Sequence, residues 1–338
     1  GRTTGVNTGK RYAAIAAGKQ GKVSCQSDLV GKIWKERPSL PGEKVFLLDE
    51  KYSGESTASK LQRVREKMKE ASADVHLLAS LDDIAWLLNL RGNDIAYCPL
   101  FLSYLLVYED HAELFADEKK FPDDVLKELE KNHILLKPYN SIYDAVHVLD
   151  SSIRIMLDPD RVNYTLYHSI PQGVSVLEHE NPEILMKSVK NDIEIVNIQE
   201  AHLKDAVAHT KFMYWLKHMA DTDETVTEIS ASDKLESFRA QQDGYLGPSF
   251  APISAFKEHG AIVHYSATPE SNATLRKGGM LLTDTGGHYW EGSTDITRTV
   301  AFGEISDREK EDFTLTARAM LRLMNTVFLH GCSGANLD

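Results

Sequence analysis

Two aspartates in the C-terminal half of the chain lie in segments that are otherwise apolar. Residues 281–302, LLTDTGGHYWEGSTDITRTVAF, have the pattern of two strands joined by a turn, with Asp284 in the first strand and Asp295 in the second. An acid in an apolar strand is costly to bury unless it is paired or binds a metal. If the strands pair antiparallel, both carboxylates can face one side, where a shared divalent cation offsets their repulsion. The stretch therefore predicts half of a metal site. Two solvated acids are the alternative, because one face of such a strand pair commonly meets water.

One histidine lies shortly before these acids. His264 is part of GAIVHY, residues 260–265, and the pattern predicts a strand over 261–265. A histidine in an apolar strand is commonly a satisfied core residue. It can also bind a metal, or donate a hydrogen bond to an oxyanion that develops beside one. Its position just upstream of two embedded acids favours the functional interpretation.

Composition and charge limit the partners that this chain can have. Its 338 residues suggest two or three domains, and 42% hydrophobic with 26% charged residues is typical of a globular protein. The net charge of −12 argues against nucleic acid as a partner. No apolar run approaches the ~18 residues of a membrane span. The three scattered cysteines, Cys25, Cys98 and Cys332, form no CxxC pair, which indicates a reducing, cytoplasmic location.

Alternating elements over residues 45–185 predict an α/β domain. We divide the chain into the tail of an N-terminal domain (1–48), this α/β domain (49–185) and a third region (186–338). Thr57 is the expected N-cap of the first strong helix. The expected helices are 11–19, 57–72, 81–88, 125–131 and 142–149, and the expected strands are 45–48, 75–78, 100–108, 112–115, 134–136 and 153–157.

The third region begins with a long predicted helix, 194–219. Its buried stripe is expected to contain Ile195, Ile198, Ala201, Leu203, Val207, Phe212 and Trp215. A second helix is expected from Thr225 to about residue 242, with Thr225 and Glu228 forming a capping box. A strand over 250–255 and a last helix over 307–328, capped by Ser306, complete the pattern.

With these residues in place, the chain resembles a known family. GAIVHY followed by LLTDTGGHYWEGSTDITRT is similar to the metallopeptidases of the pita-bread fold, in particular the three-domain Xaa-Pro aminopeptidases (aminopeptidase P). Four further segments extend the resemblance over most of the chain: IWKERP (33–38), KYSGES (51–56), NLRG (89–92) and VTEISASDKLESFRAQQ, which starts at Val226. The resemblance implies a creatinase/prolidase N-terminal-like α/β domain followed by the first half of a pita-bread catalytic domain.

The resemblance also implies roles for the three site residues. Asp284 would bind one metal and Asp295 would bridge two, with manganese the expected ion at so oxygen-rich a site. His264 would contact the substrate beside the scissile carbonyl. A metal-activated water would then release the first residue of a peptide that has proline in second position. A peptide is the expected partner, nucleic acid and membranes are not, and a homodimer is a further expectation for the full-length protein.

The resemblance departs from the family pattern at the metal site. Family members use two aspartates, one histidine and two glutamates, and the last three would lie downstream of the helix that is expected to end near Phe328. We therefore expect this polypeptide to be part of an aminopeptidase P, to hold two of five ligands, and to be inactive alone.

Two other functions remain open. One is a pita-bread module that has lost catalysis and binds peptides or proteins, against which the retention of all three residues speaks. The other is a prolidase- or creatinase-like hydrolase, against which the KYSGES and IWKERP segments speak.

Overall fold

The computed structural model describes residues 29–337. The chain separates into two compact units. The first comprises the described residues up to Glu200 together with Trp290–Gly292, and the second comprises Ala201–Tyr289 and the described residues from Ser293 onward. Among the helices of residues 29–337, none combines the length and the apolar character that crossing a membrane requires. The expected helix at 11–19 lies outside the described residues.

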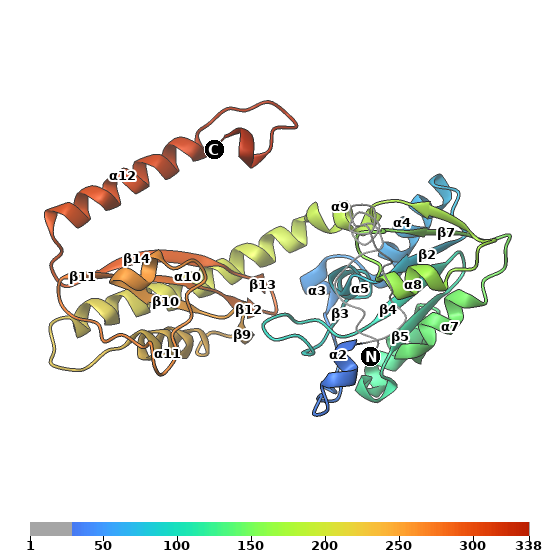
Figure 1. Ribbon diagram of the computed structural model, residues 1–338, viewed down its shortest axis with the longest axis horizontal. Coiled ribbons are helices and arrows are strands. Elements are labelled where there is room, and N and C mark those ends of the chain that lie inside the picture. The colour runs from blue at the N-terminus through green and yellow to red at the C-terminus, as the bar shows by residue number, and fades with distance from the viewer. Residues whose placement is uncertain (1–28, 338) are drawn as a thin grey trace. The chain divides into compact units, whose positions relative to one another are not determined.

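A six-stranded mixed sheet forms the centre of the first unit (Figure 1). Its strands, in spatial order, are β6 (Ile134–Pro138), β5 (Ala112–Ala116), β4 (Tyr104–Tyr108), β2 (Val75–Leu78), β7 (Arg154–Leu157) and β8 (Ser175–Glu178). The pairs β2–β4 and β4–β5 are antiparallel, and β5–β6, β2–β7 and β7–β8 are parallel. The α/β prediction is confirmed, except that the edge strand β8 was not expected from the sequence.

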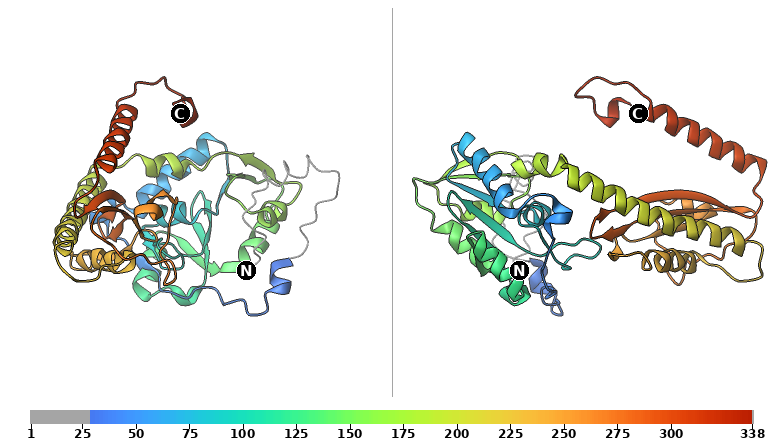
Figure 2. Two further views of the ribbon diagram at one scale, coloured as in Figure 1. Left: turned by 60° about the vertical axis from the view of Figure 1, so that its left-hand side comes forward. Right: turned by 180° about the vertical axis from the view of Figure 1, so that it is seen from behind.

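Helices cover both faces of this sheet (Figure 2). One core contains Leu61 and Val64 of α4 (Thr57–Glu70), with residues of α5 (Leu81–Leu87) and α6 (Asp123–Lys131). The other contains Val146 of α7 (Ile142–His147) and Leu166 of α8 (Tyr164–Ser169). All four residues of β2 are buried, as expected of a central strand covered on both sides.

Shorter elements complete the first unit. They are α2 (Leu29–Ile33), α3 (Glu50–Ser53), α9 (Pro182–Ser188), the paired strands β1 (Phe46–Leu47) and β3 (Leu90–Arg91), and the 3-10 turns η1 (Glu118–Lys120) and η2 (Tyr139–Ser141). Helix α4 is capped by Ser56, which accepts from the amide of Ser59. The prediction that Thr57 caps this helix is wrong, because the Thr57 hydroxyl instead donates to the carbonyl of Leu88.

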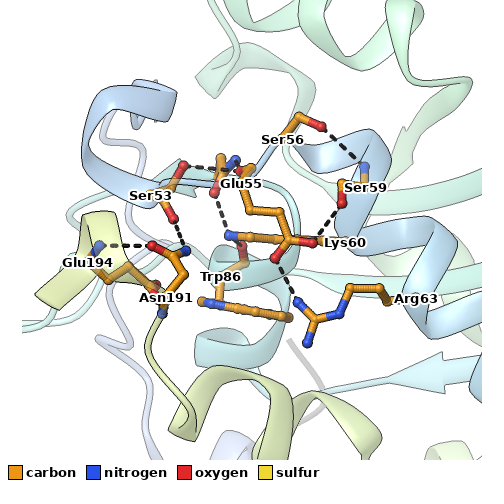
Figure 3. A network of polar contacts seen from close by, with 10 residues as sticks. Ser53, Glu55, Ser56, Ser59, Lys60, Arg63, Trp86, Asn191 and Glu194 are labelled. Atoms are coloured by element: carbon orange, nitrogen blue, oxygen red, sulfur yellow. Dashed lines mark hydrogen bonds and ion pairs between the residues drawn. The ribbon is translucent and has the colours of Figure 1, made fainter.

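A buried lysine organises the polar contacts at the start of α4 (Figure 3). Lys60 is 1% exposed, and its ammonium donates to the carbonyl of Trp86 (2.9 Å) and to Oδ1 of Asn89 (2.7 Å) while lying 4.5 Å from the Trp86 ring centroid. Burial lowers the pKa of Lys60 to about 8. Nearby, Asn191 donates to the carbonyl of Ser53 (2.9 Å) and accepts from the amide of Glu194. These bonds satisfy groups that would be costly to bury unpaired.

A second buried polar pair ties α9 to the sheet. His76 on β2 and Glu183 on α9 are both 0% exposed. Nε2 of His76 lies 3.2 Å from Oε2 of Glu183, and Nδ1 lies 3.1 Å from the carbonyl of Met156. Both ring nitrogens thus face acceptors, which only the protonated imidazole satisfies, since the neutral ring has one N–H. Burial alone would lower the pKa of His76, but the Glu183 carboxylate and the two hydrogen bonds raise it.

The second unit consists of helices and two small sheets. The strands β10 (Ile253–Phe256), β11 (Gly279–Thr285) and β14 (Ile296–Phe302) form an antiparallel sheet, and β9 (Tyr245–Pro248), β12 (Gly287–Tyr289) and β13 (Gly292–Ser293) form another. The helices are α10 (Asp192–Met219, whose first turns belong to the first unit), α11 (Glu228–Arg239) and α12 (Asp307–Met324), with the 3-10 turns η3 (Lys257–Ala261) and η4 (Gly334–Asn336). Ser306 caps α12 in a capping box with Glu309, so that expected cap is confirmed.

Two helix details of the second unit differ from expectation. The buried side of α10 is formed by Ala201, Asp205, Ala208, His209, Phe212, Leu216 and Met219, whereas Ile195, Leu203 and Val207 of the expected stripe are exposed. The capping box of α11 consists of Thr227 and Ser230 rather than Thr225 and Glu228. Glu228, as the first residue of the helix, is free to turn inward.

The His76–Glu183 pair predicts a pH dependence of stability. A histidine whose pKa is raised by folding stabilises the protein below the unfolded value of about 6.5, and this contribution is lost as the pH rises through the folded pKa. The midpoint of thermal unfolding should therefore fall as the pH rises above about 6.5. Glu183→Gln should have a weaker dependence, because the imidazolium loses its anionic partner. If the midpoint changed equally with pH in both proteins, the His76–Glu183 pair would not be the cause of the pH dependence.

Candidate metal centre

A pocket of about 410 Å³ lies beside the β10–β11–β14 sheet of the second unit. It is lined by Phe250, Ala251, Ile253, His264, Tyr265, Ser266, Asp284 and Asp295. The structure therefore brings together the three residues that the sequence singled out.

The strand pairing determines which way Asp284 points. Along β11, burial alternates, with Leu281, Thr283 and Thr285 buried and Leu282 and Asp284 partly exposed. Asp284 is opposite Ile253 on β10 and Thr297 on β14. Since successive side chains of a strand point to opposite faces, Asp284 emerges on the pocket side while its neighbours enter the core. One carboxylate oxygen, Oδ1, is buried and has no hydrogen-bond partner among the described residues.

Asp295 comes immediately before β14 rather than within it. Partial burial of its carboxyl, the negative charge of Asp284 and a hydrogen bond with Asp284 raise the pKa of Asp295. A carboxyl group whose pKa is raised by a neighbouring carboxylate marks a site where a cation relieves the repulsion between the two.

The donor set fits a divalent metal. The unpartnered oxygen of Asp284 and the electrostatically coupled Asp295 supply the hard oxygen ligands that such ions prefer. Within residues 29–337, however, no group of three or more histidine, cysteine, aspartate or glutamate side chains is arranged to hold a metal ion. The described residues thus provide a two-carboxylate part of a centre.

His264 belongs to a loop and not to the strand that the sequence predicted. Residues 257–261 form the 3-10 turn η3, and His264 follows it with a φ of +57°. This left-handed conformation is unfavourable for a residue with a side chain, and it is concentrated at functional sites. The strand prediction failed because the short apolar run Ala-Ile-Val is exposed here: Ile262 is 54% and Val263 83% exposed.

A buried network holds the residue that precedes Asp295. Thr294 is 3% exposed; its hydroxyl donates to Asp205 on α10 (2.7 Å) and accepts from the amide of Gly287 (2.9 Å). Asp205 also receives two hydrogen bonds from Arg239 on α11, at 2.5 and 3.3 Å. Because Asp205 and Arg239 are both buried and paired, they form a rigid anchor for the chain beside Asp295.

The turn between the two acids requires a glycine. A Cβ at Gly286 would lie 2.0 Å from the carbonyl oxygen of Thr294 and 2.2 Å from Oγ of Ser249. The sequence indicated a simple turn here, but the segment contributes β12 and β13 to the second sheet. The glycine pair in the sequence indicates this turn, and the close approach of the Thr294 backbone to Gly286 is the physical reason for the glycine.

Residues that sequence reasoning missed lie around the same pocket. Phe250, Ile253 and Tyr265 line it, and Asp205, Arg239 and Thr294 support it from the helix side. For Asp205 the available signal was a charged residue one helical turn before His209, which is also buried. Burial, with the positive charge of Arg239, lowers the pKa of His209 to about 4, so this ring is neutral at neutral pH.

Comparison with known proteins identifies both parts of the chain. Residues 36–194 match the Creatinase/Prolidase N-terminal domain, and residues 196–338 match metallopeptidase family M24. Residues 196–338 therefore belong to metallopeptidase family M24. The fold of the chain combines a creatinase/prolidase N-terminal α/β domain with the pita-bread fold of family M24, as the resemblance implied.

Individual M24 relatives agree with this assignment. The chain is 38% identical to Xaa-Pro aminopeptidase 1 of Dictyostelium discoideum, over 90% of the chain and 48% of that protein. It is 36% identical to Xaa-Pro aminopeptidase ApepP of Drosophila melanogaster, over 94% of the chain and 52% of that protein. The chain therefore spans about half the length of these relatives.

Solved structures of M24 proteins share the fold. An X-prolyl aminopeptidase from Caenorhabditis elegans, described as a cytosolic enzyme with a di-nuclear active site, superposes with a TM-score of 0.88 at 31% identity, over 97% of this chain and 55% of that one. An Xaa-Pro dipeptidase from Bacillus anthracis, at 22% identity and a TM-score of 0.63 over 80% of this chain and 72% of that one, shares the fold.

The carboxylate pair of this M24 chain predicts opposite effects on stability and on metal binding. Because folding raises the pKa of Asp295, its ionised form opposes folding at neutral pH. Asp295→Asn should raise the melting temperature of the metal-free chain at pH 7 and abolish any stabilisation by added Mn²⁺. Thermal unfolding with and without the ion measures both. Near about pH 3, below the unfolded pKa, the metal-free difference should vanish. A lower melting temperature for the variant at pH 7 would contradict the repulsion.

The Thr294 network predicts a stability loss that depends on one hydroxyl. Thr294→Val keeps the shape of the side chain but leaves an acceptor on Asp205 and the amide of Gly287 without their partner. The expected loss is about 1–3 kcal/mol of unfolding free energy, measured by urea denaturation. Thr297→Val, at an exposed position on β14, is the matched control and should change stability by less than about 0.5 kcal/mol. Similar losses for both variants would count against the network.

Proposed function

We propose that this chain is part of a metal-dependent Xaa-Pro aminopeptidase, a hydrolase that removes the first residue from peptides with proline in second position. The observation that carries the proposal is the pocket that unites Asp284, Asp295 and His264. Support comes from relatives named Xaa-Pro aminopeptidase, which are similar over 90% or more of the chain.

The three residues divide the work in this proposal. Asp284 and Asp295 hold two divalent cations together with ligands from elsewhere in the protein, with manganese as the expected ion at an oxygen-rich site. When bound, the metal pair activates a water and polarises the scissile carbonyl. His264 lines the same pocket, and its imidazole would contact the substrate and donate to the charge that develops on the carbonyl oxygen. The apolar lining of Phe250 and Ile253 excludes water from the reacting groups.

The described residues do not suffice for this chemistry. Two carboxylates bind a divalent ion weakly, and the described residues offer no larger ligand group. We therefore propose that the polypeptide alone is inactive and that a protein supplying the remaining ligands is the enzyme. The proposed organisation is an N-terminal domain tail (1–48), a creatinase N-terminal-like domain (49–185) and half of a catalytic domain (186–338).

The proposed setting is the cytoplasm, on the strength of the C. elegans enzyme that is described as cytosolic. The proposed partner is a peptide with an Xaa-Pro N-terminus, and the net charge of −12 does not favour nucleic acid. We propose a homodimer for the full-length protein on the resemblance alone.

The activity is tested with the full-length protein and a panel of substrates. Loaded with Mn²⁺, it should release the first residue from Xaa-Pro-Yaa tripeptides, measured by liquid chromatography of the products. His264→Ala should lower kcat about 10²–10³-fold, as expected for the loss of a donor to a developing oxyanion. Asp284→Ala should abolish activity together with metal content.

The same panel separates the alternatives. Preference for Xaa-Pro dipeptides over the tripeptides would identify a prolidase. Binding of Xaa-Pro peptides without turnover or bound metal would identify a binding module, which would refute the enzymatic proposal. The polypeptide of residues 1–338, assayed in parallel, should show no turnover.

A further inference from the structure

One buried carboxylate in the second unit has no part in the chemistry described above. Glu228, the first residue of α11, is 0% exposed and accepts four hydrogen bonds. Oε1 accepts from the amide of Phe256 (2.7 Å) and from Nδ1 of His259 (2.8 Å). Oε2 accepts from the hydroxyl of Tyr265 and from the amide of Ala273, both at 2.9 Å. All four donors belong to the segment 256–273, which carries His264.

The four bonds enclose the strained part of this segment. Lys257 (φ +51°) and His264 (φ +57°) both adopt the left-handed conformation, which side chains disfavour. Lys257 follows the Phe256 amide, and His264 precedes Tyr265, so Glu228 holds the chain next to each strained residue. Such conformations persist only when surrounding contacts over-determine them.

The aromatic contacts reinforce the same arrangement. The rings of His259 and Tyr265 stack with centroids 4.5 Å apart, and both donate to Glu228. Tyr265 is 7% exposed, whereas the adjacent His264 is exposed and lines the pocket. Burial alone would raise the pKa of Glu228, but the hydrogen bonds from Ala273, Phe256, His259 and Tyr265 lower it. The ionised carboxylate is therefore the form that this segment binds.

We infer that Glu228 is the positioning residue for His264: it fastens both ends of the 256–265 loop and so imposes the left-handed backbone that points the imidazole into the pocket. Glu228 touches neither the pocket nor the acids and acts through Tyr265 and the loop. The catalytic effect that we infer for Glu228 rests on the proposed function. The structural effect on the backbone of His264 does not depend on that function.

The catalytic part is tested by a double-mutant cycle in the full-length, metal-loaded protein. Glu228→Gln keeps the size of the side chain but replaces an oxygen that accepts two bonds with an amide nitrogen that faces two donors. It should lower kcat about 10–100-fold with little change in KM, because His264 acts on the developing charge. In the His264→Ala background the same substitution should change kcat less than about threefold. Multiplicative effects in the double variant would overturn the inference.

A second substitution covers the case in which Glu228→Gln does not fold. His259→Phe keeps the stacking on Tyr265 but removes one donor to Glu228, and His259 does not line the pocket. It should lower kcat several-fold, and this loss should disappear in the His264→Ala background. Glu236→Gln on the same helix is the matched control, since Glu236 accepts from Tyr245 and not from the 256–273 segment. It should leave kcat and KM unchanged.

The structural part is tested by NMR on the polypeptide of residues 1–338. In Glu228→Gln the backbone ¹³C shifts of His264, which depend on φ and ψ, should lose their left-handed signature. The amides of Phe256 and Ala273 should exchange with solvent at least about tenfold faster, whereas Leu281 and Val300 in the β11–β14 ladder should keep their protection. Unchanged ¹³C shifts and unchanged amide exchange rates in Glu228→Gln would refute the role of Glu228 in holding this loop. If the full-length wild-type protein had no Xaa-Pro activity while Glu228→Gln still caused these NMR and exchange changes, the proposed function would be refuted and the positioning role would remain.

Discussion

The repulsion between two carboxylates is the constraint on which the second unit depends. Asp284 and Asp295 share one pocket, and the charge of Asp284 raises the pKa of Asp295. Because the two carboxylates repel each other when both are ionised and no cation is bound, the backbone must hold them together. The seven-residue antiparallel register of β11 with β14 provides the backbone frame, and the buried side chains of Leu281, Val300 and Phe302 attach that frame to the helices.

Each of the three site residues has a buried neighbour in sequence that holds it in place. Thr294 precedes Asp295 and is bonded to Asp205; Tyr265 follows His264 and is bonded to Glu228. Asp284 lies between Thr283 and Thr285, both buried on the opposite face of β11. Each site side chain can therefore remain accessible, because packing and hydrogen bonds fix the position of its buried neighbour. Sites of this kind are built from rigid supports rather than from the contacts of the reactive groups themselves.

The sequence predicted the strands and the side on which the acids lie, because alternation of apolar residues in β11 is a local signal that survives folding. It also predicted the α/β unit, whose helices and strands have strong periodicity and whose core is apolar on both faces of the sheet. It did not predict that β12 leaves the hairpin to pair with β9. The partner strand lies about 40 residues earlier in the sequence, and its short run of Tyr-Leu-Gly-Pro has no strand pattern.

Two further errors, at α10 and at Glu228, share one physical cause, which is the burial of polar side chains. The stripe expected for α10 is only partly correct, because the buried side includes Asp205 and His209, so apolar periodicity averages out around the helix. A glutamate near the start of a helix commonly belongs to a capping box, which is why the sequence predicts that role for Glu228. In the structure, four hydrogen-bond donors from a distant segment instead offset the cost of burying its carboxylate. Binary patterns assume that polar residues face water, and they fail where a protein buries charge to fix a site. In this chain the failures at Asp205 and Glu228 both lie next to residues that flank the pocket. A disagreement between apolar pattern and burial is therefore itself a pointer to the groups that hold the site.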